Sequence, residues 1–122
     1  MTDETFEQAA RTYGDMLYRV AYHALKNRAD AEDVVQTVLL KLYQQESCFD
    51  GEDHMKHWLL RVTVNESRKL LRSFKEAAAA MGVKPSTVQT WLQRARDRLR
   101  KTLSESEEEG EGNPYVRPER VP

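Results

Sequence analysis

Residues 30–45 read DAEDVVQTVLLKLYQQ, and their apolar side chains recur every three or four positions, which is the spacing of an amphipathic helix. Asp30 stands where an N-cap belongs, while Glu32 and Asp33 put negative charge in the first turn, where the helix dipole favours it. We therefore predict a helix over 31–45 with one buried stripe. The side chains of that stripe are Val34, Val35, Val38, Leu39, Leu42 and Tyr43.

Two more helices are predicted beside this one. The same apolar spacing predicts a first helix over about 4–26 and a third over about 55–74. Between the second and third, residues 46–53 contain the turn pair Asp50-Gly51 and no helical period, so they are predicted to form a loop. Three such helices can bury one core, and the predicted fold class is all-α.

A helix-turn-helix is predicted over residues 75–103. The run 75–81 consists of good helix formers without a breaker, so the third helix could continue straight into it until Gly82 stops it. Pro85 then opens a last helix that reaches about residue 103. In this motif the second helix lies in the major groove of DNA, although an ordinary αα-hairpin has the same spacing. The side chains expected to face outward are Ser86, Thr87, Gln89, Thr90, Gln93 and Arg94.

Composition and charge restrict the functional class. Only 39% of the residues are apolar, and the sequence contains neither a signal peptide nor an apolar run long enough for a membrane span, so we expect a cytoplasmic protein without membrane insertion. The single cysteine, Cys48, allows no internal disulfide. The three histidines fall in no metal-ligand spacing and no glycine-rich phosphate loop occurs, so no catalytic residue, metal or cofactor is expected, and the protein is not expected to be an enzyme.

The charges are segregated along the chain. Residues 1–55 carry 5 basic and 11 acidic side chains, a net charge of −6, whereas residues 56–101 carry 12 basic and 3 acidic side chains, a net charge of +9. Residues 102–122 carry 2 basic and 6 acidic side chains, a net charge of −4. The simpler interpretation is that these charges only keep the helix faces soluble. A net charge of +9 over residues 56–101 exceeds what solubility needs, so this segment is a candidate surface for a polyanion.

Two blocks of the sequence resemble the extracytoplasmic-function (ECF) group of bacterial RNA polymerase sigma factors. Residues 13–43 contain ADAEDVVQ at 29–36, and residues 57–73 read HWLLRVTVNESRKLLRS; together they resemble the domain that binds the polymerase clamp and the minus-ten promoter element. Residues 76–99, EAAAAMGVKPSTVQTWLQRARDRL, resemble half of the domain that reads the minus-thirty-five element.

The resemblance implies core RNA polymerase and promoter DNA as partners. It implies that Asp30, Glu32, Asp33 and Gln36 dock on a coiled coil of the clamp, where opposite charge favours association. In the loop before the third helix it implies a pocket for a flipped base, formed by Phe49, Asp50 and His54. Along the third helix, phosphates and bases of the minus-ten element would meet Lys56, Arg61, Asn65, Arg68, Lys69 and Arg72.

The chain departs from the family after residue 74. The flexible linker and two helices of the second domain are absent, which predicts three parts: a promoter-binding domain over 1–74, a partial helix-turn-helix over 75–103, and a disordered acidic tail over 104–122. The function expected from the resemblance is a sigma factor, with an anti-sigma factor as a possible further partner. A clamp-binding regulator that does not initiate transcription and a free-standing dimeric helix-turn-helix repressor remain as alternatives.

Overall fold

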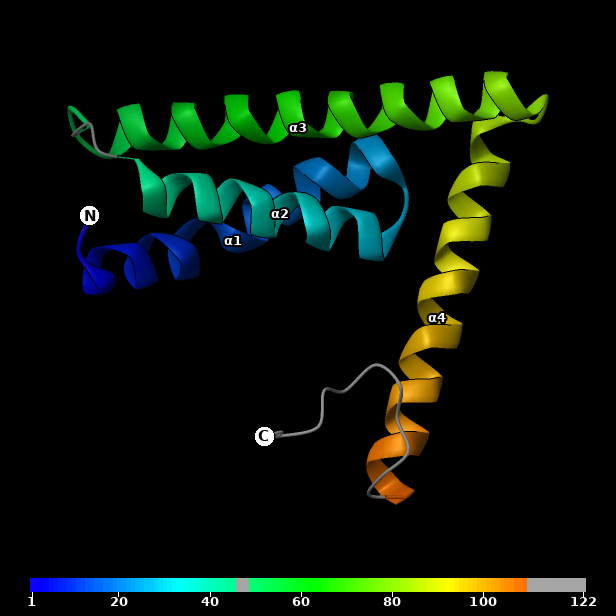
Figure 1. Cartoon of the computed structure of the whole chain (residues 1–122). Coiled ribbons are helices and arrows are strands. Elements are labelled where there is room, and N and C mark those ends of the chain that lie inside the picture. Colours follow the sequence, from blue (N-terminus) through cyan, green and yellow to red (C-terminus); the bar gives the residue numbers. More distant parts are fainter. Residues whose placement is uncertain (46–48, 110–122) are drawn as a thin grey trace.

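The computed structural model describes residues 1–45 and 49–109, except for the side chains of residues 106–109. This part of the chain forms four α-helices and no strand, which confirms the predicted all-α class. The helices are α1 (Asp3–Leu25), α2 (Arg28–Gln44), α3 (Glu52–Met81) and α4 (Pro85–Glu109). Figure 1 shows α1, α2 and α3 lying side by side, with α4 leaving the end of α3 at a steep angle.

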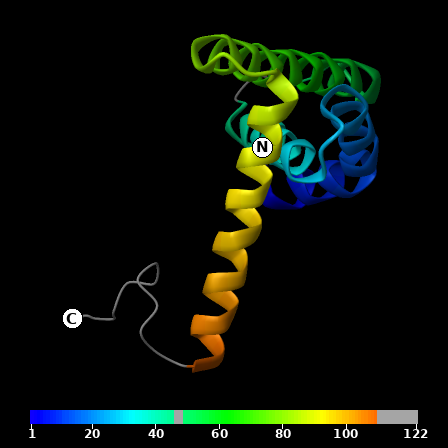
Figure 2. The same cartoon turned by 90° about the vertical axis from the view of Figure 1, so that its right-hand side faces the viewer.

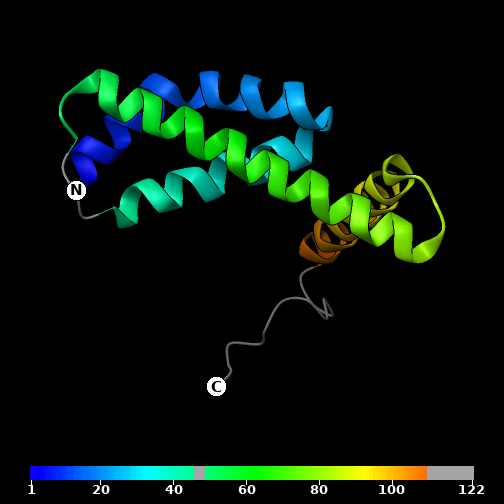
Figure 3. The same cartoon turned by 90° about the horizontal axis from the view of Figure 1, so that it is seen from above.

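Helices α1, α2 and α3 share one hydrophobic core. Leu17 and Leu25 of α1, Val38 and Leu42 of α2, and Leu59 of α3 are buried at its centre. Burial of an aliphatic side chain of this size contributes about 1.5–3 kcal/mol, so these residues dominate the stability of the unit. Figure 3, the view from above, shows α3 crossing over both other helices. The three-helix unit is therefore a rigid frame for whatever its surfaces bind.

Helix α2 begins three residues earlier than predicted, because its N-cap is Asn27 and not Asp30. The backbone N–H of Asp30 donates to Asn27 Oδ1 at 2.9 Å, and Asp30 itself lies within the first turn. Lys26, in the left-handed conformation at φ 54°, ends α1 directly before this cap. Asn27 and Asp30 are both residue types that cap helices, and the structure uses Asn27, the earlier one.

Helix α3 runs without interruption from the promoter-binding part into residues 75–81, a continuation that the unbroken run of helix formers allows. Beyond the main core it forms a second, small cluster in which Phe74 and Ala78 pack against Val88 of α4. Gly82 ends α3 in the left-handed conformation at φ 72°, and Val83 N–H closes the turn on Ala78 O at 3.0 Å. The predicted helix, glycine turn and helix are therefore present, but the first of the two helices continues the three-helix unit.

Helix α4 extends to Glu109, beyond the residue at which a disordered tail was predicted to start. Glutamate is a good helix former, so the acidic run that suggested disorder also allows the helix to continue. The rest of that predicted tail, residues 110–122, lies outside the described residues, as does Cys48. Among the described helices, none has both the length and the apolar character needed to cross a membrane.

Candidate nucleic-acid interface

The outward face of α3 carries a row of basic side chains around one amide. Arg61, Asn65, Arg68 and Arg72 follow one another at intervals of three or four residues and are all exposed. At 1.5 Å per residue the row is about 17 Å long. Arginines spaced in this way can hold successive phosphates, while the Asn65 side chain offers both a donor and an acceptor to a base edge.

Of the other two predicted DNA-contacting residues, Lys56 lies off this row and Lys69 borders it. Lys56 is exposed, but it is displaced about 140° around the helix from Arg61 at 100° per residue. Lys69 is engaged by Glu66, whose carboxylate lies 3.4 Å from Lys69 Nζ and 3.0 Å from Lys41 Nζ of α2. Burial acts to raise the pKa of Glu66, but the hydrogen bond and charge of Lys41, helped by Lys69, outweigh it and lower that pKa below its ordinary value. Glu66 thus joins α2 to α3 beneath the basic row.

The residues of the predicted base pocket contact one another at the start of α3. The Phe49 ring meets His54 edge-on at 5.2 Å and Trp58 at 5.6 Å, and Phe49 packs against the main core. His54 Nδ1 accepts a hydrogen bond from the backbone N–H of Asp50 at 2.9 Å. The structure therefore brings Phe49, Asp50 and His54 together at the start of α3, as predicted, in a closed arrangement.

The acidic start of α2 differs from the prediction, because Asp30 is buried. Its side chain is only 1% exposed, and its two oxygens accept bonds from Arg96 at 2.6 Å and Gln89 at 3.3 Å, both from α4. The Arg96 guanidinium also reaches Asp33 Oδ2 at 3.1 Å. No local signal in the sequence marks Arg96, because its two partners lie more than 60 positions away along the chain.

The remaining predicted docking residues of α2 lie at the surface. Glu32 is exposed and pairs with Arg28 at 3.5 Å, and Gln36 is exposed one turn further along. Leu40 follows Gln36 and Asp33 on the same face and is 56% exposed. The sequence held a signal for it, since Leu40 falls outside the apolar stripe of its helix, where a polar residue is usual.

The six predicted contact residues of α4 separate into two sets. Ser86, Thr90 and Arg94 are exposed and lie four residues apart on one face, as predicted. Gln89 is turned inward and donates to Leu25 O at 2.9 Å, which contradicts its predicted outward position. Thr87 and Gln93 are half-buried, which also departs from their predicted outward position. Gln93 Nε2 donates a hydrogen bond to Asp97 Oδ1 within α4 at 2.9 Å.

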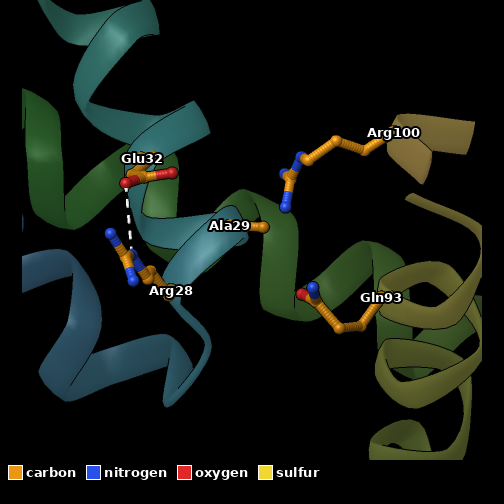
Figure 4. A pocket seen from close by; sticks show the side chains of 5 residues that line it. All are labelled: Arg28, Ala29, Glu32, Gln93 and Arg100. Carbon is orange, nitrogen blue, oxygen red and sulfur yellow. Dashed lines mark ion pairs between the residues drawn. The ribbon is translucent and has the colours of Figure 1, made fainter. Parts of the chain in front are cut away.

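Helices α2 and α4 enclose a small cleft next to these contacts. It has a volume of about 280 Å³ and is lined by Arg28, Ala29 and Glu32 of α2 and by Gln93 and Arg100 of α4. Figure 4 shows the two α4 side chains pointing across toward the first turn of α2. The start of α2 is therefore covered on one side by polar and basic groups of α4.

The described helices form an all-α frame whose third helix carries a row of arginines around an exposed amide, an arrangement suited to a nucleic-acid backbone. Two family profiles match the chain: Sigma-70 region 2 over residues 9–76, and Sigma-70, region 4 over residues 72–99. Since the first match covers more than half of the chain, the protein belongs to the sigma-70 family.

Two curated proteins of Bacillus subtilis (strain 168) are similar to the chain. The ECF RNA polymerase sigma factor SigX is 30% identical over 60 residues, which is 49% of this chain and 31% of the relative. The ECF RNA polymerase sigma factor SigW is 28% identical over 72 residues, which is 59% of this chain and 38% of the relative. The matches thus span about a third of the length of these relatives and agree with the resemblance to the ECF group. No solved structure matches the chain significantly.

Proposed function

We propose that the chain is a sigma factor of the ECF type, a subunit without catalytic activity that binds core RNA polymerase and directs it to promoter DNA. The observation that carries the proposal is the exposed row of Arg61, Asn65, Arg68 and Arg72, which lies within the region 2 match. Its arginines would hold the backbone of the minus-ten element while Asn65 contacts a base. Lys56 and Lys69 would add charge at the edges of this surface.

The outward face of α2 is the proposed surface for core polymerase. Asp33, Gln36 and Leu40 lie on that face, and Glu32 borders it. Carboxylates at the start of the helix and an exposed leucine two turns further on suit a basic partner helix that also carries an apolar side chain, such as the clamp coiled coil. Asp30, being buried, would act by positioning Arg96 and not by touching polymerase.

Base capture would take place at the start of α3. Phe49 packs on His54 and Trp58, so an incoming flipped base would replace one of these ring contacts with a stack of its own. Asp50 and His54 would then present their polar groups to its edge. The helix-turn-helix would contribute less, because only Ser86, Thr90 and Arg94 of its predicted contacts are free on one face of α4.

The proposal is tested by transcription in a reconstituted system. Purified chain is added to core RNA polymerase with a library of promoter fragments, and the run-off products are sequenced. A common minus-ten element among the transcribed fragments is the expected result, and the absence of any chain-dependent transcript would refute the proposal. The Asn65→Ala variant should open promoters at least tenfold less well with unchanged polymerase affinity, while Gln8→Ala, at an exposed amide of α1, serves as the matched control.

A second candidate function is a regulator that occupies the clamp without initiating transcription. The inward position of Gln89 favours it, because a recognition helix tied to the three-helix unit has fewer groups for DNA. Retention of polymerase by the immobilised chain, together with no run-off product from any fragment, would select this candidate over the first.

A further inference from the structure

Helix α4 is joined to the start of α2 by specific polar contacts and not only by packing. Arg96 bridges Asp30 at 2.6 Å and Asp33 at 3.1 Å, so one guanidinium binds two carboxylates. Gln89 adds a bond to Leu25 O, the last carbonyl of α1, at 2.9 Å. These bonds join α4 to a part of the chain with which it shares no extensive apolar core.

The same α4 surface meets one end of the α2 face that we assign to polymerase, at Asp33, and leaves Gln36 and Leu40 exposed. Gln93 and Arg100 border the cleft above Ala29 and Glu32, as Figure 4 shows. Arg96 holds Asp33, which belongs both to this contact and to the outward face with Gln36 and Leu40. A basic partner helix approaching α2 would therefore meet arginines of α4 where it needs free carboxylates.

Release of α4 would disturb little else. Helix α4 packs on α3 through a small cluster of Phe74, Ala78 and Val88, next to the turn at Gly82. Figure 2 shows the rest of α4 running past the end of α2 and away from the three-helix unit. A rotation about the turn would free α2 while leaving the main core intact.

We propose that α4 is a latch on the polymerase-binding face of α2, formed by Gln89, Gln93, Arg96 and Arg100, and that binding of core polymerase requires the latch to open. The inference rests on the proposed function, because it takes the outward face of α2 as the polymerase surface. Arg96 occupies Asp30 and Asp33 in place of the basic partner, so the closed chain and the polymerase-bound chain would exclude each other. The closed form is then an autoinhibited form of the protein.

Opening is measured first, without polymerase. In a Cys48→Ser background, spin labels are attached at Thr12→Cys and Lys101→Cys, which are both exposed positions, and the distance distribution is recorded. Arg96→Ala should broaden and lengthen that distribution. Arg98→Ala is the matched control, because Arg98 is exposed and lies about 200° around α4 from Arg96 at 100° per residue; it should leave the distribution unchanged.

Affinity for core polymerase is measured next with the same two variants. Loss of two charge-assisted contacts should raise the affinity of Arg96→Ala about tenfold over that of the unaltered chain, whereas Arg98→Ala should change it less than twofold. In a complementary experiment, α4 is held against α2 by a short, reducible thiol cross-linker between Ala29→Cys and Gln93→Cys, two positions that line the same cleft. The cross-linked chain should lose polymerase binding, and reductant should restore it.

The outcomes separate the latch from the proposed function. Unchanged label distances in Arg96→Ala would overturn the latch as a physical contact. Longer label distances in Arg96→Ala with unchanged polymerase affinity would overturn the competition between α4 and polymerase for α2, and so would full polymerase binding by the cross-linked chain. Either result leaves the sigma-factor assignment intact. No binding of polymerase by any variant, open or closed, would overturn the proposed function and the competition with it.

Discussion

Neutralising the three arginines of the basic row on α3 should flatten the salt dependence of promoter binding. The change is Arg61→Gln, Arg68→Gln and Arg72→Gln together. Adjacent members are about 6 and 10 Å apart along the helix, so each has room for its own phosphate. Each phosphate contact contributes about 0.7 to 0.9 to the slope of log affinity against log salt concentration, so the triple variant should lose about 2 to 3 from that slope.

The assay is a salt titration of holoenzyme binding to labelled promoter DNA. Between 50 and 200 mM salt the unaltered protein should lose about 20- to 40-fold more affinity than the triple variant, which is the slope difference applied to a fourfold rise in salt. The matched control neutralises Arg11, Arg19 and Lys26, three exposed positions of α1 and its cap, with the same total change in charge. An equal slope in the arginine-row variant and the control would show that net charge, and not the row, holds the phosphates.

Three further changes test the frame and the polymerase face. Glu66→Gln should destabilise the fold by only about 0.5–1 kcal/mol at pH 7, since the lysine partners of Glu66 are exposed. Because the pKa of Glu66 is lowered in the folded state, this contribution should vanish as the pH falls from the ordinary pKa of glutamate through the folded one. Denaturant titrations at neutral pH and at low pH, with Glu76→Gln as control, measure it. An equal effect at low pH would exclude the ion pair as its cause. Gly82→Ala should lower the free energy of unfolding by about 1–2 kcal/mol, from the left-handed backbone alone, because an added Cβ meets no atom within 4 Å. A larger loss of stability in thermal unfolding would mean that neighbouring atoms crowd the added Cβ. Leu40→Glu should weaken binding of core polymerase at least tenfold with unchanged melting temperature, and unchanged affinity would remove Leu40 from the polymerase face.

Most secondary structure could be predicted from the sequence because its signals are local. The apolar spacing of α1, α2 and α3 and the glycine turn at Gly82 depend on neighbours within a few residues. The errors also have local causes. Asn27 and Asp30 are both good N-caps, and the acidic run after Leu103 is compatible with helix as well as with disorder.

The basic row of α3 was likewise predictable in its main part. Arg61, Asn65, Arg68 and Arg72 share a face by helical spacing alone, so tertiary structure was not needed to group them. Helical spacing also places Lys69 beside them and three residues from Glu66, its partner on the same helix. The contact of that carboxylate with Lys41 of α2 is visible only in the packed fold.

The helical class, the segregation of charge and the basic face of α3 can be derived from residue order alone, because they depend on spacing along the chain and within single helices. The burial of Asp30, the inward position of Gln89 and the bridge from Arg96 to Asp30 and Asp33 appear once the helices are packed. They depend on the angle at which α4 leaves α3, which brings together residues more than 60 positions apart. No local pattern encodes that angle, and it decides which carboxylates of α2 are free for a partner.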